Sequence, residues 1–269
     1  MRLSHSSCRR GTFLRRLQCS KATLDALVML TITVCFPSHL LGQAEQPKLP
    51  DPPKEIAELI DQGKVKIEFY DRMPAGQRFE GETHFQFDVN YRFRFRFPRQ
   101  DVRTGRRYVD VTLHSIRVLP QNRISVPRAY ADENVWQAGL ILHEFEHVRI
   151  NSDPRLYLLL RKLVSGVKRI ELPANTVDRN TIGNTVDRQV QTLITATTEL
   201  LQKNNDLLDT VTRHGITPEY KDINFFHRLF MEDNLREQGF AYLPQVKTLL
   251  KSRSYSKHAK SDQTLQPED

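Results

Sequence analysis

The chain has 269 residues, of which 39% are hydrophobic and 27% charged, an ordinary composition for a globular protein. This composition excludes collagen-like, low-complexity and disulfide-scaffold proteins. The formal net charge is +8, but residues 1–44 hold six cations and one anion (+5), whereas the remainder holds 34 cations and 31 anions (+3). Because the basic balance belongs mostly to the N-terminus, we expect no nucleic-acid partner.

The first 44 residues have the pattern of a secretory signal peptide. Basic residues precede an apolar run of eleven residues, 26–36, which is too short to span a membrane. Gly42-Gln43-Ala44 then supplies small residues at the positions that a signal peptidase reads, so we expect cleavage after Ala44. The expected product is secreted or periplasmic, without stable membrane insertion. An uncleaved anchor is the alternative.

The cysteines restrict the kinds of site that the exported part can form. Cys8, Cys19 and Cys35 all lie in the predicted signal, and residues 45–269 contain no cysteine. A disulfide or thiolate metal site is therefore excluded there, and any metal must be held by His, Asp or Glu. We expect residues 45–251 to form one domain and residues 252–269 to be a disordered polar tail. The sequence indicates no oligomeric state.

The first half of the exported chain is predicted to be mainly strands. A Pro-rich leader and a short helix over 54–62, closed by Gly63, come first. Hydrophobic and polar residues then alternate over 84–97, which predicts one long strand or two joined at a bend. Further strands are expected over 64–70, 108–119 and 123–126, with a turn at 120–122.

After Pro127 the hydrophobic pattern becomes helical. Helices are expected over 132–151, 152–170, 185–213 and 218–238. Since strands precede helices, the predicted class is α+β: an N-terminal antiparallel sheet followed by a zincin-like helical half. The sequence Asn-Thr-Val-Asp-Arg occurs at 175–179 and again at 184–188, and we interpret it as a lengthened helix connection.

The residues that carry chemistry are His143-Glu144-Phe145-Glu146-His147, within the first of these helices. Positions i and i+4 share one helix face, about 6 Å apart along the axis, so both imidazoles can bind one Zn²⁺. Glu144 can reach a metal-bound water without ligating the metal. The alternative is a helix with two solvated histidines, but the apolar neighbours predict a packed setting in which burying these groups without a joint purpose is costly.

A catalytic zinc needs a third protein ligand. His214 is the best-placed candidate, because it ends a predicted helix whose terminus can direct a side chain at another helix. His227 lies among apolar residues, where a lone histidine is more often part of the core. The acidic candidates are Glu232 and Asp233. The sequence thus predicts metal ligands His143, His147 and His214, with Glu144 as the base.

The order of these motifs resembles a bacterial family of predicted secreted zinc-dependent proteases, long catalogued as a domain of unknown function. The resemblance covers about residues 64–215 and combines HExxH with Asp-x-x-Thr-x-His-Gly at the end of a later helix. The matching residues are Trp136, His143, Glu144, His147, Asp209, Thr212, His214 and Gly215. The resemblance implies that the three histidines bind zinc and that Glu144 is the catalytic base.

The remaining polar residues have simpler interpretations. Arg92, Arg94, Arg96 and Arg99 would lie on a solvated strand face, although such a face can also bind an acidic polymer. His84 and His114 are interpreted as strand residues without a metal role. Asp209 and Thr212 either support the metal ligands or lie on a helix surface. Candidates for stabilising an oxyanion are Arg213, Tyr220 and His227.

The sequence therefore predicts an exported zinc metallopeptidase that hydrolyses a peptide or protein substrate. One alternative is an exported, zinc-stabilised and non-catalytic binding protein of the cell envelope, which would tolerate loss of Glu144. Another is an envelope module that binds anionic polymers through the arginine face.

Overall fold

The computed structural model describes residues 9–11, 47–96, 99–100, 107–172, 178–216 and 224–261. The three cysteines, the expected cleavage site after Ala44 and Tyr220 lie outside the described residues. Within the described part of the chain, no helix combines the length and the apolar character needed to cross a membrane.

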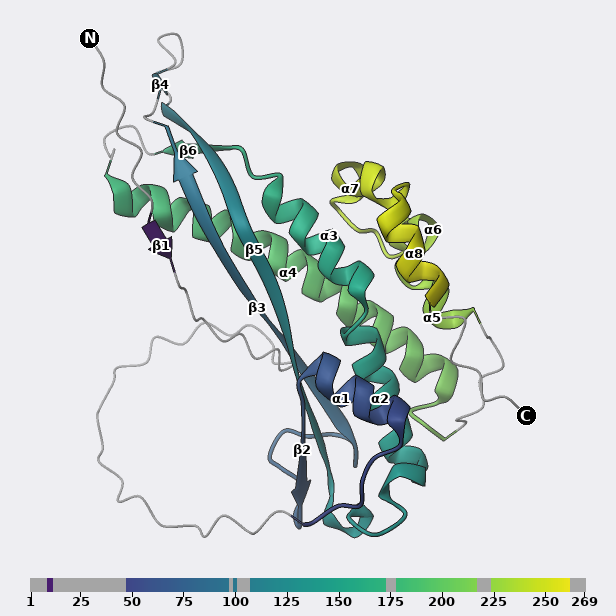
Figure 1. The fold of residues 1–269 in the computed structure, drawn as a ribbon. Coiled ribbons are helices and arrows are strands. Elements are labelled where there is room, and N and C mark those ends of the chain that lie inside the picture. Colours follow the sequence, from purple (N-terminus) through teal and green to yellow (C-terminus); the bar gives the residue numbers. More distant parts are fainter. Residues whose placement is uncertain are drawn as a thin grey trace, which may run out of the picture.

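Two long antiparallel strands, β3 and β5, form the centre of an open sheet (Figure 1). β1 pairs with the outer edge of β3, β2 pairs with β5 on the other side, and β4 and β6 also pair with β5. The strands are β1 (Arg9–Gly11), β2 (Val65–Tyr70), β3 (Glu82–Phe95), β4 (Arg99–Gln100), β5 (Arg107–Pro127) and β6 (Arg169–Leu172).

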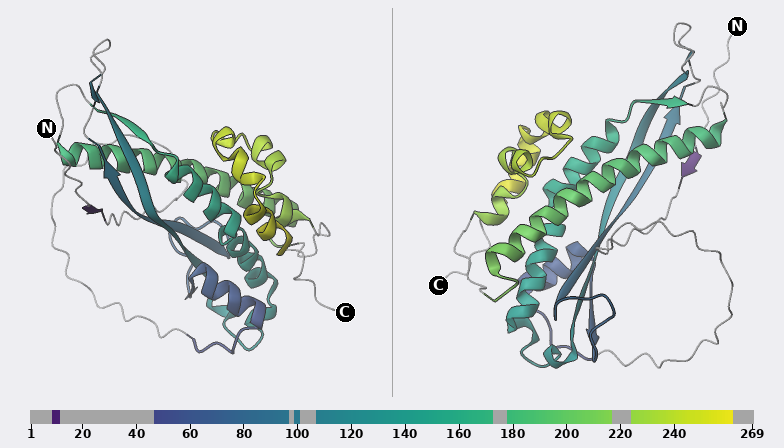
Figure 2. Two further views of the ribbon diagram at one scale, coloured as in Figure 1. Left: turned by 45° about the horizontal axis from the view of Figure 1, so that its top comes forward. Right: turned by 180° about the vertical axis from the view of Figure 1, so that it is seen from behind.

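Apart from α1, the helices follow β5 in the chain, and they cover one side of the sheet; Figure 2 shows α4 crossing the β3–β5 pair. The fold class is therefore α+β, as predicted. The helices are α1 (Lys54–Gly63), α2 (Gly139–Asn151), α3 (Pro154–Ser165), α4 (Arg179–Thr212), α5 (Phe225–Arg228), α6 (Glu232–Glu237), α7 (Leu243–Leu250) and α8 (Arg253–Ser261), with 3₁₀ turns η1 (Arg128–Tyr130) and η2 (Val135–Gln137).

The sheet differs from the prediction in two ways. The predicted turn at 120–122 does not form, because β5 continues through it with Pro120 opposite Phe87. A strand tolerates proline where one edge lacks a partner, and β2 joins β5 only from Asn122 onward. β2 is also parallel to β5 rather than antiparallel, because β3 supplies the long connection that a parallel pair needs.

The helices differ from the prediction mainly at their ends. α2 begins at Gly139, because Asp132 accepts a hydrogen bond from the backbone N–H of Asn134 and closes a turn instead of capping a helix. α4 begins earlier than predicted, where Asp178 of the first repeat caps it through Asn180 and Thr181. The predicted tail includes α8, and buried Tyr255 donates its hydroxyl hydrogen bond to the carbonyl of Phe230.

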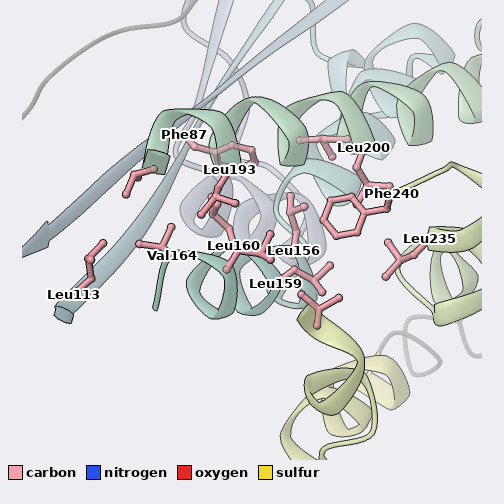
Figure 3. Close-up of a cluster of buried hydrophobic side chains, with 14 of the residues drawn as sticks. Phe87, Leu113, Leu156, Leu159, Leu160, Val164, Leu193, Leu200, Leu235 and Phe240 are labelled. Atoms are coloured by element: carbon pink, nitrogen blue, oxygen red, sulfur yellow. The ribbon is translucent and has the colours of Figure 1, made fainter. Parts of the chain in front are cut away.

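The core consists of two hydrophobic clusters, and α2 lies between them. The larger cluster joins β3 and β5 to α3, α4 and the C-terminal helices (Figure 3). The smaller cluster lies between α1, β2, β5 and α2. Phe145 and Val148 of α2 belong to the smaller cluster, and Ile150 belongs to the larger. The HExxH helix is therefore held from two sides, which fixes the directions of its polar side chains.

Candidate metal centre

α2 and α4 bring three ligand-type side chains to one point. His143 and His147 lie one helical turn apart, and their Nε2 atoms are 3.2 Å from each other. Asp209, on the last turn of α4, places its Oδ1 atom 3.2 Å from Nε2 of His143 and 3.1 Å from Nε2 of His147. The two histidines are 5% and 8% exposed, so these polar atoms meet in a largely dry setting.

The spacing of these three atoms suits a metal ion. A tetrahedral ion with ligand distances of about 2.0 Å has neighbouring ligands about 3.3 Å apart, and an octahedral ion with distances of about 2.1 Å has them about 3.0 Å apart. The observed separations of 3.1–3.2 Å lie between these values. The His143, His147 and Asp209 group could therefore hold a metal ion.

A chain of buried asparagines fixes the proton position on His147. Asn122 donates from Nδ2 to the carbonyl of Gly63 at 2.8 Å, so its Oδ1 accepts from Asn151 at 3.1 Å. Asn151 then accepts from Nδ2 of Asn205 at 2.9 Å. Oδ1 of Asn205 is left to accept from Nδ1 of His147 at 2.8 Å. Because a carbonyl can only accept, each step has one direction, and Nδ1 of His147 carries the proton.

In the neutral tautomer, this proton leaves a lone pair on Nε2 of His147, directed toward His143 and Asp209. A metal-ligating histidine normally has this arrangement, with its second nitrogen donating to an outer partner. A lone pair facing a carboxylate oxygen is unfavourable unless positive charge lies between them. The hydrogen-bond network thus fits a cation at this point.

The ionisation behaviour of the group agrees with that conclusion. Burial lowers the pKa of His143, but its interactions with Asp209, Glu146 and Glu144 outweigh burial and raise that pKa to about 9. Burial alone would raise the pKa of Asp209, but the two imidazoles hold it well below its usual range. The pocket therefore stabilises positive charge beside Asp209, which protons or a metal ion can supply.

Glu144 lies beside the group without belonging to it. Its carboxylate is 3% exposed and accepts a 2.6 Å hydrogen bond at Oε2 from the hydroxyl of Thr83 on β3. Burial raises the pKa of Glu144, while His147 and Thr83 partly oppose that rise. The backbone of Gly81 approaches closely, since a Cβ added there would lie 2.3 Å from Oε1 of Glu144. This close packing holds the carboxylate in place.

His214, the third ligand predicted from sequence, lies beside the group rather than within it. Its Nδ1 is 3.7 Å from Oδ1 of Asp209, and its side chain is 52% exposed and stacks on Phe79 at 4.6 Å. The chain leaves α4 through left-handed residues, which bring Gly215 against the ring of His143. Asp209 lies within α4 on the face toward the histidine pair, whereas His214 follows the left-handed residue Arg213 beyond the end of the helix.

The sequence alone predicts only a supporting or surface role for Asp209. The signal that could have identified it is its spacing from Asn205, because positions i and i+4 of α4 face the pair at i and i+4 of α2. The other proposed third ligands lie elsewhere. The carbonyl of His227 accepts a hydrogen bond from Arg155, and Glu232 and Asp233 form ion pairs with Arg236.

Comparisons with protein-family models, with curated proteins and with solved structures found no match for this chain.

Proposed function

We propose that the protein is a zinc-dependent peptidase of the HExxH type, in which His143, His147 and Asp209 hold the metal and Glu144 is the general base. The observation that carries the proposal is the convergence of three ligand atoms within 3.1–3.2 Å of one another, directly beside a buried glutamate. Zinc peptidases use this combination of three protein ligands, an open coordination position and an adjacent carboxylate.

Zinc is proposed from the residue types and their order. Two imidazoles and one carboxylate suit zinc, and the glutamate that follows the first histidine is typical of zinc peptidases. His214 lies on the exposed side of Asp209, where a substrate would approach. We therefore assign His214 to the open side of the centre and Asp209 to the third ligand position.

The side chains of this chain supply the acid–base chemistry. When bound, zinc lowers the pKa of a coordinated water toward neutrality and polarises a carbonyl. Glu144 accepts the proton of the attacking water and returns it to the leaving amine, and its raised pKa suits a base that works near neutral pH. Thr83 holds the carboxylate through its hydroxyl group, so the base keeps one orientation.

A non-catalytic, zinc-stabilised binding protein is the second candidate. The observation that favours it is the buried asparagine chain, which ties α4 and α2 to β5 and the end of α1 through His147, as a structural metal site would. The two candidates differ at Glu144, because a structural site needs no base.

The experiment combines metal analysis with cleavage of a broad peptide library by the wild-type chain and by Glu144→Gln. We expect bound zinc in both proteins and a loss of cleavage of about 10²–10⁴-fold in the variant, since general-base contributions have that size. Glu133→Gln is the matched control, because Glu133 is exposed and precedes α2. Zinc binding without any cleavage by the wild type, with no change in Glu144→Gln, would instead favour the non-catalytic protein.

A further inference from the structure

A groove of about 1210 Å³ lies between β3 and α4, away from the metal ligands. Residues 85–89 and Tyr91 form its β3 wall, residues between Asn184 and Gln202 form its α4 wall, and Tyr242 contributes at one side. Small-molecule sites usually measure about 300–1,000 Å³. The volume and the two long walls therefore suit an extended chain better than a compact ligand.

The length of the groove sets the size of its occupant. From Asn184 to Gln202 there are 18 residue steps, or about 27 Å of helix at about 1.5 Å per residue. From Phe85 to Tyr91 there are six steps, or about 20 Å of strand at about 3.3 Å per residue. An extended peptide of about six to eight residues matches these walls.

Both walls lead to the candidate metal centre. On β3, Thr83 precedes the groove by two residues and donates its hydrogen bond to Glu144. On α4, Asn205 and Asp209 follow Gln202 within two helical turns. A chain lying in the groove would therefore have one end at the proposed zinc and base.

The groove follows the open edge of β3. Residues from both faces of the strand line it, such as Phe87 from one face and Asp88 from the other. Among the described residues, this edge of β3 pairs only with β1, over 91–93 (Figure 1). Since β5 occupies only the other edge, the remaining backbone groups on the open edge are positioned to pair with an added strand.

The β1 pairing also indicates the direction of such a strand. Arg9 lies opposite Phe93 and Gly11 opposite Tyr91, so β1 is antiparallel to β3 and runs toward the groove. A peptide that continued in this direction would reach the metal centre with its C-terminal end.

The lining indicates the composition of the peptide. Phe85, Phe87, Val89 and Ile194 supply apolar surface, and the charged residues are Asp88, Asp187, Glu199 and Arg188. Three acidic groups against one basic group favour a peptide with basic residues among apolar ones. Asp187 also accepts a hydrogen bond from the hydroxyl of Tyr91 across the groove.

We propose that this groove binds an extended, apolar and basic peptide of about seven residues as an antiparallel strand on β3, and that this peptide is the part of the substrate preceding the cleaved bond. The assignment as substrate rests on the proposed peptidase function. Binding itself does not require catalysis, so the two are separable.

The first test varies substrate length. Starting from a peptide that the wild type cleaves, versions with two and with eight residues before the cleaved bond are compared. We expect kcat/KM to be at least tenfold higher for the long version. Thr192→Trp, at an exposed position of the groove wall, should remove that advantage. Gln189→Trp is the control, on α4 but outside the lining. Equal kcat/KM for both lengths in the wild type would overturn the groove assignment.

The second test separates the groove from the peptidase. Fluorescence anisotropy follows a labelled eight-residue peptide of alternating valine and lysine on the Glu144→Gln protein. We expect binding that Thr192→Trp weakens at least tenfold and Gln189→Trp does not. Glu199→Lys should weaken it too, and should strengthen binding of a matched peptide that carries glutamate in place of lysine. Such binding without cleavage by the wild type would support the groove and reject the peptidase. No binding, or equal binding in all variants, would reject the groove whatever the activity.

Discussion

Two buried charged clusters in this protein differ in how their polar atoms are satisfied. The guanidinium of Arg155 is fully buried and donates to both oxygens of Asp153 and to the carbonyls of Phe226 and His227. Its hydrogen bonds join α3 to the C-terminal helices, and each partner supplies an oxygen acceptor to the guanidinium. In the second cluster, Nε2 of His143, Nε2 of His147 and Oδ1 of Asp209 converge on one point.

The comparison distinguishes a structural charge from a site for a ligand. Ions that are buried for stability need opposite charges and filled hydrogen bonds, which Arg155 has. Atoms that converge on one point, as the two Nε2 atoms and Oδ1 of Asp209 do, need positive charge between them, which protons on the imidazoles or a shared metal ion can supply. Both clusters contain buried charges, so the number of charges does not show which one is a ligand site. The directions of their lone pairs and protons do.

His147→Ala should produce the largest effect of the substitutions proposed, on both bound metal and activity. Two protein ligands hold zinc poorly, so we expect the variant to lose both bound metal and activity. Metal analysis and peptide cleavage measure this directly. A chelator should lower the melting temperature of the wild type but not that of the variant. Full metal occupancy in His147→Ala would show that the metal is bound elsewhere.

Arg155→Ala should have the opposite effect, a loss of stability without a loss of metal binding. Removing one partner of a buried ion pair costs about 3–5 kcal/mol, so the free energy of unfolding should fall by that amount while zinc stays bound to the folded fraction. Denaturant titration measures the change. Arg169→Ala is the control, because its pair with Asp110 is exposed and such pairs contribute about 0–1 kcal/mol. A selective loss of metal affinity in Arg155→Ala would mean that the clusters are coupled.

Asp209→Asn and His214→Ala decide between the two third ligands. If Asp209 ligates the metal, Asp209→Asn should lower zinc affinity by more than about 100-fold, beyond the 10–100-fold typical of outer partners. His214→Ala should then change affinity by less than about tenfold, because its side chain is half exposed and its Nδ1 lies 3.7 Å from Oδ1 of Asp209, outside the three converging atoms. Competition with a chromophoric chelator gives both values. The reverse ranking would restore the ligand set predicted from sequence.

The local parts of the site could be predicted from sequence, and the distant parts could not. His143 and His147 share a helix face because their spacing alone decides it. The partner of that face comes from α4, and whether Asp209 or His214 reaches it depends on where the helix ends and how the chain turns at Arg213. No local pattern contains that information.

The same difference between local and distant information decides which parts of the fold could be predicted. The alternating residues of β3 gave its length nearly correctly, because burial on one face has a period of two. The local preference of Pro120 predicts a turn, but pairing with β3 overrides that preference. The parallel pairing of β2 is a matter of topology and leaves no mark on the residues themselves.

Substitutions of Asn205 should have the smallest effect of those proposed. They test whether the proton on Nδ1 of His147 contributes to metal binding. Asn205→Leu removes the acceptor that holds the proton on Nδ1 of His147, so zinc affinity should fall by about 10–100-fold. Asn205→Asp keeps that acceptor but loses the donor to Asn151, so it should lose stability and retain affinity. Asn204→Leu is the matched control: Asn204 is buried beside it but contacts Leu229 and Asn234 instead. It should lower stability without changing affinity. If Asn204→Leu and Asn205→Leu lowered affinity equally, the asparagine chain would have only a structural role, and the proton on His147 would be set by the metal alone.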